Sequence, residues 1–434
     1  MKLWDKGAGP DKKTDQFTVG QDRELDIILA PYDIKASRAH ALMLGKIGLL
    51  TPAETADLVR ELDALAQQAA QGNFCIEPEF EDMHSKIEFL LTEKLGDTGK
   101  KIHTARSRND QVLVALQLYL KAEIQEIQQR LSELFSLLMT LAETHQKVLL
   151  PGYTHLQIAM PSSFGLWFSA YAESFIDDVY LLQAAYRVAD QNPLGSAAGY
   201  GSSFPIDRDF TTSELGFAAL KVNVVAAQMG RGKVERLTAT ALSGVAATLS
   251  KLAMDVCVYM SQNFGFISFP DRLTTGSSIM PHKKNPDIFE LIRGKCNLIQ
   301  GIPAQLTLLT NNLPSGYHRD MQLTKEVLLP AIESLKSCLE MATTSLGEIQ
   351  VKTDILEDPK YDYLFSVDAL NELVLEGMPF RDAYRKMGEA IENQTYAPVK
   401  SATHTHQGSL GNLCLDRIRQ KMADALGITE SSLG

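Results

Sequence analysis

Residues 276 to 287 are the stretch of this chain whose side chains most directly suggest chemistry. They read Gly-Ser-Ser-Ile-Met-Pro-His-Lys-Lys-Asn-Pro-Asp. Asn285 and the proline after it predict a helix that begins near Asn285. Lys283 and the hydroxyls of Ser277 and Ser278 would then surround the positive end of a helix dipole, which favours bound carboxylates or phosphates. The stretch therefore predicts a mobile loop that binds an anionic substrate; a capped loop without function is the alternative.

A second polar loop precedes a long helical pattern at residues 103 to 111, which read His-Thr-Ala-Arg-Ser-Arg-Asn-Asp-Gln. Guanidinium groups bind carboxylates bidentately, and backbone amides at a helix N-terminus add to that binding. Arg106 and Arg108 are thus expected to form a clamp for a carboxylate or a phosphate. The alternative is that Asn109 or Asp110 only caps the helix and that both arginines are solvated.

A third loop contains His155, which lies between Thr154 and Gln157 in a short turn and not on an amphipathic helix face. Glu290 lies one turn inside the helix expected after residue 285 and could orient and charge an imidazole. The two residues are candidates for acid-base chemistry. A structural histidine is the alternative.

The loop from 192 to 208 is rich in glycine and serine and offers backbone donors. No strand pattern precedes it, and a phosphate-loop pattern ending in Gly-Lys-Ser or Gly-Lys-Thr is missing, so a dinucleotide site is not indicated. A loop that lines a ligand and a crossing between subunits both remain open.

Long helical patterns join these loops. They cover residues 109–148, 161–190, 237–263, 286–300 and 325–346. The first has apolar residues on two faces, as in the interior of a bundle. Shorter helices are expected on either side, among them one that starts with a capping box at Thr51 and one from Phe80 to Leu95. The prediction is an all-α chain with three helical domains, 1–105, 106–355 and 356–434, whose central bundle is completed by homo-oligomerisation.

Composition narrows the classes of function. The 434 residues carry a net charge of -11 with a pI near 5.4, which does not favour nucleic acid or anionic lipid as a partner. No apolar signal core opens the chain and no apolar run is expected to span a membrane, so a cytoplasmic protein is predicted. Five scattered cysteines are expected to be reduced core thiols.

Together the loops resemble the fumarase/aspartase superfamily, whose signature Gly-Ser-Ser-x-Met-Pro-x-Lys-x-Asn, followed by Glu, fits residues 276 to 290. Ser-Arg-Asn-Asp-Gln at 107–111, Thr-His-Leu-Gln at 154–157 and Pro-Ile-Asp-Arg at 205–208 are similar to the argininosuccinate lyase family within it. The similarity extends to residues 364–381 and so covers most of the chain.

The resemblance implies an all-helical homotetramer whose long helices form a central bundle and whose active sites each draw on three subunits. It implies the reversible elimination of fumarate from argininosuccinate to give arginine, the last step of arginine biosynthesis, without metal or organic cofactor.

The resemblance also implies roles for individual residues. Ser277, ionised inside the closed loop, matches the general base, and Lys283 with Asn285 would stabilise the doubly charged aci-carboxylate. His155, oriented by Glu290, is the expected general acid. Substrate contacts are expected from Ser107, Arg108, Asn109, Thr154, Ser278, Asn285, Tyr317, Gln322, Lys325 and His84.

The chain departs from the family at residues 5–8, at Ala105, at 196–203 and at His318 and Arg319. Three other functions are open. An adenylosuccinate lyase-like enzyme is disfavoured by the motif at 107–111. A non-catalytic crystallin-like protein is disfavoured because the four residues assigned to chemistry are present. A helical scaffold would not explain polar loops at helix junctions.

Overall fold

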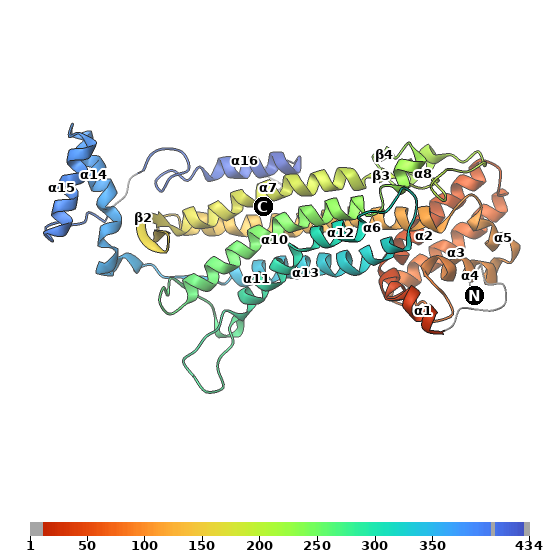
Figure 1. The fold of residues 1–434 in the computed structure, drawn as a ribbon, viewed down its shortest axis with the longest axis horizontal. Coiled ribbons are helices and arrows are strands. Elements are labelled where there is room, and N and C mark those ends of the chain that lie inside the picture. The colour runs from red at the N-terminus through yellow and green to blue at the C-terminus, as the bar shows by residue number, and fades with distance from the viewer. Residues whose placement is uncertain (1–11, 401–403, 429–434) are drawn as a thin grey trace. The chain divides into compact units, whose positions relative to one another are not determined.

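The computed structural model describes residues 12–400 and 404–428, so the departure at residues 5–8 lies outside the described chain. Helices dominate the element order (Figure 1), as the sequence predicts. The strands of the described residues form three two-stranded ribbons, β1–β2, β3–β4 and β5–β6. The chain divides into two compact units. The long helices α6 (Arg108–Thr144), α7 (Phe164–Ala189), α10 (Lys233–Met260) and α13 (Leu323–Leu346) contribute residues to both units.

Unit 1 comprises residues 1–127, 181–244 and 298–335. Besides its parts of the long helices it contains α1 (Lys12–Val19), α2 (Asp22–Lys46), α3 (Pro52–Ala70), α4 (Met83–Leu95), α5 (Asp97–Lys100), η1 (Lys101–His103), β3 (Gln191–Asn192), α8 (Arg208–Glu214), β4 (Ala219–Leu220), α9 (Val224–Gln228), α12 (Ile302–Thr310) and η3 (Arg319–Gln322). One of its buried clusters joins small residues of α2 to larger residues of α6 and of the loops before and after α8: Ala36, Ala39, Val114, Leu118, Leu194, Leu215 and Phe217.

Local signals set several helix boundaries in unit 1. The capping box at Thr51 is present, with both of its hydrogen bonds to Glu54. The helix expected from Phe80 begins instead at Met83, because the Asp82 side chain caps it by accepting from the Ser85 amide at 2.8 Å. Helix α12 was not predicted.

Asp110 joins the Gly/Ser-rich loop to the start of α6. One of its carboxylate oxygens accepts from the Ser107 amide at 2.9 Å, and the other accepts from the amides of Gly195 and Ala197 at 3.0 and 2.9 Å. The expectation that no strand precedes this loop was wrong, because Asn192 ends the two-residue strand β3, which pairs in parallel with β4. The loop therefore buttresses the N-terminus of α6.

Unit 2 comprises residues 128–180, 245–297 and 336–434. Besides its parts of the long helices and most of α11 (Asp287–Ile299), it contains β1 (Leu149–Thr154), β2 (Gln157–Ser163), β5 (Ile267–Ser268), η2 (Asp271–Leu273), β6 (Gln350–Val351), η4 (Ile355–Glu357), η5 (Pro359–Phe365), α14 (Ser366–Leu375), α15 (Phe380–Glu392) and α16 (Leu415–Leu426). The shorter helices expected after the long ones are present as α14, α15 and α16.

Residues 149–163 form a β-hairpin that the sequence reading missed. His155 and Leu156 form its turn with φ angles of 54° and 57°, the left-handed pair that a tight hairpin turn requires. The helix expected from Pro161 therefore starts later, at Phe164, because Pro161 pairs with Pro151 in the ribbon. The first long helix likewise ends at Thr144 and not at residue 148.

Three expectations from composition need correction or detail. Contrary to the prediction, helix α10 is long and apolar enough to cross a membrane, by length and composition only, and the core helices of soluble proteins can share both properties. Of the cysteines, Cys296 and Cys338 are buried but Cys75 is exposed, and all five are free thiols.

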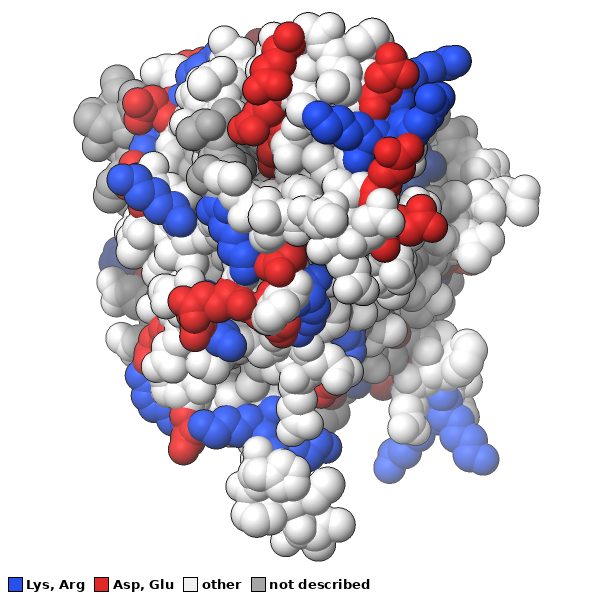
Figure 2. All heavy atoms as spheres, turned by 90° about the vertical axis from the view of Figure 1, so that its left-hand side faces the viewer, with Lys and Arg blue, Asp and Glu red and all other residues white. Residues whose placement is uncertain are grey.

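Among the residues drawn in Figure 2, basic and acidic side chains are interspersed on the face shown.

Candidate active site

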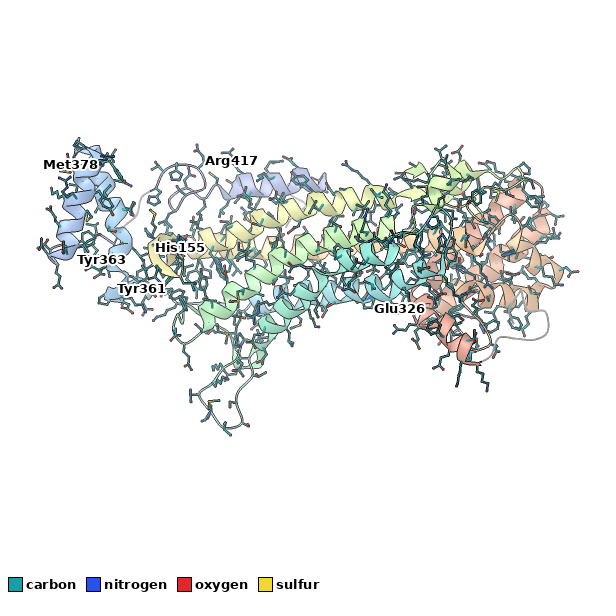
Figure 3. All side chains as sticks on the ribbon, in the orientation of Figure 1. His155, Glu326, Tyr361, Tyr363, Met378 and Arg417 are labelled. Atoms are coloured by element: carbon teal, nitrogen blue, oxygen red, sulfur yellow. The ribbon has the colours of Figure 1, made fainter. Side chains whose placement is uncertain are left out.

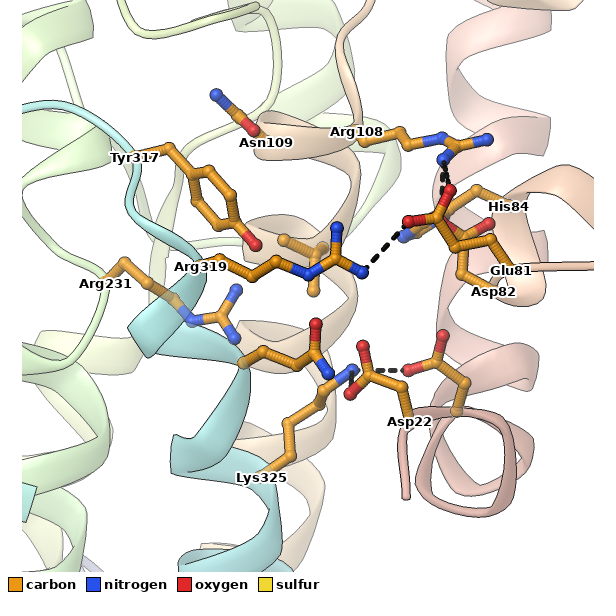
Figure 4. A pocket seen from close by; sticks show the side chains of 13 residues that line it. Asp22, Glu81, Asp82, His84, Arg108, Asn109, Arg231, Tyr317, Arg319 and Lys325 are labelled. Atoms are coloured by element: carbon orange, nitrogen blue, oxygen red, sulfur yellow. Dashed lines mark hydrogen bonds and ion pairs between the residues drawn. The ribbon is translucent and has the colours of Figure 1, made fainter. Parts of the chain in front are cut away.

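A polar cavity of about 250 Å³ lies in unit 1 (Figure 4). Four acidic and four basic side chains line it together with His84 and four neutral residues: Asp22, Asp26, Glu81, Asp82, Arg108, Arg231, Arg319, Lys325, Asn109, Val112, Tyr317 and Gln322. These residues lie in or just before the first turns of α2, α4, α6, α10, α13 and η3. Helix N-termini and polar side chains of both signs therefore converge on one small volume.

The cavity brings together six of the residues predicted to bind substrate, namely His84, Arg108, Asn109, Tyr317, Gln322 and Lys325. Ser107 lies immediately before α6, and its hydroxyl accepts from the Asn109 amide at 3.3 Å. Sequence positions more than two hundred residues apart thus meet at one site.

Two arginines face each other across a shared carboxylate. The Glu81 side chain accepts from Arg108 at 3.1 Å and from Arg319 at 3.0 Å, one on each oxygen (Figure 4). Arg108 also donates to the Ser85 hydroxyl at 2.6 Å and forms an ion pair with Asp82 at 3.2 Å. Protein side chains therefore hold both guanidinium groups, that of Arg108 at the first residue of α6 and that of Arg319 at the first residue of η3.

Lys325 is the most deeply buried cation of the cavity, with 3% of its surface exposed. Its ammonium lies 2.7 Å from Asp22 and 2.6 Å from Asp26. Burial opposes the charge, but the carboxylates of Asp26 and Asp22 outweigh it and raise the pKa of Lys325. Burial raises the pKa of Asp22 to about 6, because the attraction of Lys325 only partly offsets desolvation. One ammonium shared by two carboxylates leaves this end of the cavity electronegative.

The surroundings of His84 favour the charged form of its imidazole. Its Nδ1 lies 3.0 Å from the Asp33 carboxylate, and the attraction of Asp33 exceeds the effect of burial and raises the pKa of His84. Burial would raise the pKa of Asp82, but His84 and Arg108 outweigh it and the pKa of Asp82 falls. At this side of the cavity His84 and Arg108 are therefore each close to a carboxylate, that of Asp33 or of Asp82.

Arg106 does not belong to the clamp predicted from residues 103–111. Its side chain is buried, donating to the Ile102 carbonyl at 3.1 Å and to the Ser37 hydroxyl at 2.8 Å, and it is absent from the lining of the cavity. Only Arg108 lines the site, because the Arg106 side chain is held instead by the Ile102 carbonyl and the Ser37 hydroxyl.

Several lining residues were not predicted from the sequence, namely Asp22, Asp26, Glu81, Asp82 and Arg231. Arg319 was noted only as a departure from the family. The sequence does contain a signal for Asp22 and Asp26, because they are four residues apart on one helix and a buried lysine needs carboxylate partners. Nothing in the sequence pairs them with Lys325, which is about three hundred residues away.

The predicted catalytic loop belongs to unit 2 and is largely exposed. The Ser277 hydroxyl oxygen accepts from the amides of Ile279 and Met280 at 3.3 and 3.2 Å. Asn285 does not cap the helix as expected: its amide donates to the Thr275 carbonyl at 2.8 Å and so closes the loop, and α11 starts at Asp287. Lys283 and Ser278 are exposed, with no side-chain partner among the described residues.

His155, Thr154 and Glu290 also belong to unit 2. His155 lies in the turn between β1 and β2 (Figure 3), and both it and Thr154 are exposed. Within the described chain, no hydrogen bond or ion pair joins His155 to Glu290. The cavity of unit 1 therefore holds predicted binding residues, while the predicted acid and base lie elsewhere in the chain.

The cavity can bind a small molecule that carries both signs of charge. Arg108, Arg319 and the amides at the start of α6 suit carboxylates, and the Asp22–Asp26 end suits an ammonium or guanidinium group. Among the described residues, no cluster of three His, Cys, Asp or Glu side chains could hold a metal ion.

The raised pKa of Asp22 predicts a pH-dependent effect of Asp22→Asn. The wild-type protein loses stability as the pH rises from 3.8 through about 6, because its folded state holds this proton more tightly than the unfolded state. The variant has no carboxyl group at this position and does not lose this stability. The difference in free energy of unfolding, variant minus wild type, should therefore rise by up to about 3 kcal/mol between pH 3.8 and about 6. Thermal unfolding at several pH values tests this, with Asp22→Glu as a titrating control. A difference that does not vary with pH contradicts it.

Comparisons with known proteins bear on this site and fold. A family model described as "Lyase" matches residues 11–301. The argininosuccinate lyase of Parabacteroides distasonis is 58% identical over 427 residues, covering 98% of this chain and 96% of that protein. That of Phocaeicola vulgatus is 56% identical over 422 residues, covering 97% of this chain and 95% of that protein. A crystal structure of EDDS lyase in complex with formate matches with a TM-score of 0.77 at 22% identity and covers 97% of this chain and 90% of that one, which shows a shared fold.

The family match, the two relatives and the shared fold agree with the motif resemblance and confirm the predicted all-α, fumarase/aspartase-like fold. The chain belongs to the lyase family and, within it, to the argininosuccinate lyases.

Proposed function

We propose that this protein catalyses the reversible elimination of fumarate from argininosuccinate to give arginine, the last step of arginine biosynthesis. The observation that carries the proposal is identity above 50% to proteins named argininosuccinate lyase over nearly the whole chain. The cavity of unit 1 supports it, because argininosuccinate combines three carboxylates with a guanidinium and an ammonium group. A site lined by four acids and four bases suits such a molecule.

Substrate binding is assigned to the two ends of the cavity. The succinyl carboxylates would bind Arg108, Asn109 and Ser107 at the N-terminus of α6, where the helix dipole and the charge of the Arg108 guanidinium both favour an anion. The arginine end would contact Tyr317, Gln322 and Lys325. Gln322 is already fixed there, since its amide donates to the carbonyls of Thr18 and Val19 at 3.1 and 2.9 Å.

Ser277 is assigned as the general base that removes the proton next to a carboxylate. Such a proton is much less acidic than an ordinary side chain, so the carbanion must be stabilised as an aci-carboxylate by fixed cations and dipoles. The two amides that donate to the Ser277 oxygen would also stabilise its alkoxide form. Lys283 and Asn285 are assigned to the extra negative charge, and closure of the exposed loop is a required step.

His155 is assigned as the general acid that protonates the departing nitrogen, with Glu290 as its orienting partner. Thr154 and Ser278 are assigned to substrate carboxylates. Because His155 has no partner within the described chain, its contact with Glu290 would form in the assembled enzyme.

The assembly is proposed to be a homotetramer with three helical domains per chain and active sites shared between subunits. Large apolar side chains are exposed beside the residues assigned to chemistry: Leu156, Ile158 and Met160 on the hairpin and Ile279 on the loop. Ile279 is 83% exposed and Leu156 is 82% exposed, and contact with a partner subunit would remove this apolar surface from water. The cytoplasm is the proposed location, since five free cysteines suit a reducing compartment.

The first test is the reaction itself. Purified protein should release fumarate from argininosuccinate, measured by ultraviolet absorbance, with equal formation of arginine. Release of fumarate from adenylosuccinate and not from argininosuccinate would assign the protein to the related enzyme class. Release from neither would favour a crystallin-like structural role.

Ser277→Ala should lower kcat by about 10²- to 10⁴-fold, the usual contribution of a general base, because the hydroxyl acts in the transition state. Substrate binding, measured by calorimetry with the variant, should persist. Ser278→Ala is the matched control and should mainly raise KM. An equal loss of substrate binding in Ser277→Ala would remove its role as the base.

Shared sites predict complementation between inactive variants. Mixing His155→Ala and Ser277→Ala under conditions that exchange subunits should restore part of the activity, because some sites then receive both wild-type residues. The refolded single variants are the controls. Mixed tetramers that form, by mass spectrometry of one labelled variant, but remain inactive would contradict the sharing of these residues.

A further inference from the structure

A second cavity of about 290 Å³ lies in unit 1 next to the proposed active site. It is formed by the turn between α9 and α10 and by the segment from Thr310 to Met321, and its lining residues include no aspartate or glutamate. Gly232 makes this arrangement possible, because its φ is 76° and a Cβ there would lie 2.6 Å from the Thr310 side chain. A side chain at this position would push the two walls of the cavity apart.

Three cations line this cavity, and two of them are uncompensated. Arg231 is buried and neutralised, since its Nε lies 2.9 Å from Glu235. Lys233 and Arg236 line the cavity one helical turn apart at the start of α10, and neither side chain has a partner among the described residues. A chain with a net charge of -11 therefore presents a local site with two unpaired positive charges.

The positions of these charges favour one compact dianion. Lys233 and Arg236 lie on the same side of the first turn of a 28-residue helix, whose dipole adds positive potential there. Asn311 and Ser315 line the same cavity and have no side-chain partners within the described ranges. A phosphate group brings two charges and several acceptor oxygens to one point. Fumarate carries its charges at opposite ends, so it satisfies this arrangement less well.

We propose that this cavity is a binding site for a phosphate group, either inorganic phosphate or the phosphate of a small metabolite. The volume is close to the lower end of small-molecule pockets, about 300 Å³, which leaves room for a substituent on the phosphate.

The site also shares a wall with the proposed active site. Arg231 lines both cavities and donates to the Met321 carbonyl at 2.8 Å, within the 3-10 helix η3. That helix carries Arg319 and Gln322, and Tyr317 lies just before it. A bound phosphate would therefore restrain the segment that presents these side chains to substrate.

The test measures phosphate binding to the intact protein without substrate, so its outcome does not depend on the proposed reaction. Calorimetric titration with inorganic phosphate, at ionic strength held constant with chloride, should show saturable binding. The double variant Lys233→Gln/Arg236→Gln should weaken binding at least about tenfold, because it removes two charge-assisted contacts. Lys251→Gln, which removes an exposed charge from the same helix, should bind as wild type does.

Two further arms identify the source of the phosphate and guard against misfolding. Tighter binding of adenosine monophosphate than of inorganic phosphate, with none for adenosine, would indicate a phosphate ester; equal binding would indicate free phosphate. Arg236→Lys keeps the charge and should retain binding with an unchanged thermal midpoint. Absence of saturable binding by wild type, or equal phosphate binding by the correctly folded double variant, overturns the proposal.

Discussion

The buried ammonium of Lys325 is the interaction on which the site in unit 1 depends. An isolated charge with 3% exposure would cost several kcal/mol, so it persists only because Asp22 and Asp26 lie within 2.7 Å. This requirement fixes the start of α13 against the start of α2. It also places Gln322 against the carbonyls that end α1. The same contacts that satisfy the lysine therefore shape the cavity.

The rest of the cavity follows a similar principle, in which each charge is held by a neighbour before substrate arrives. The Glu81 carboxylate accepts hydrogen bonds from both Arg108 and Arg319, and the Asp33 carboxylate lies within hydrogen-bonding distance of the His84 ring. Charges that are fixed in advance need little reorganisation when a charged substrate binds, and the free energy of binding is then available for the reaction. Asp110 performs the corresponding task for the backbone, because it ties the 193–201 loop to the first turn of α6.

The residues assigned to proton transfer have a different character. Ser277 and His155 lie on exposed turns, next to apolar side chains that face solvent in a single chain. The residues proposed to bind substrate are thus fixed by contacts within unit 1, whereas the proposed acid and base lie on exposed segments of unit 2 that carry exposed apolar side chains. This division is what the proposed homotetramer requires, since it would let helix ends from different chains meet.

The sequence by itself determined the long helices, the capping box at Thr51 and the polar loops, because helical periodicity and capping act within a few residues. It also determined the family, through short motifs whose order is preserved. It predicted six lining residues of the cavity by resemblance, but it missed Asp22 and Asp26, and it assigned Arg106 to the clamp. Only the tertiary structure decided that Asp22 and Asp26 neutralise Lys325 and that Arg108, and not Arg106, lines the cavity. Both results depend on contacts between segments that are distant in the sequence. The tertiary structure likewise decided that residues 149–163 pair as a hairpin, since a ladder of cross-strand hydrogen bonds leaves no periodic signal in so short a segment.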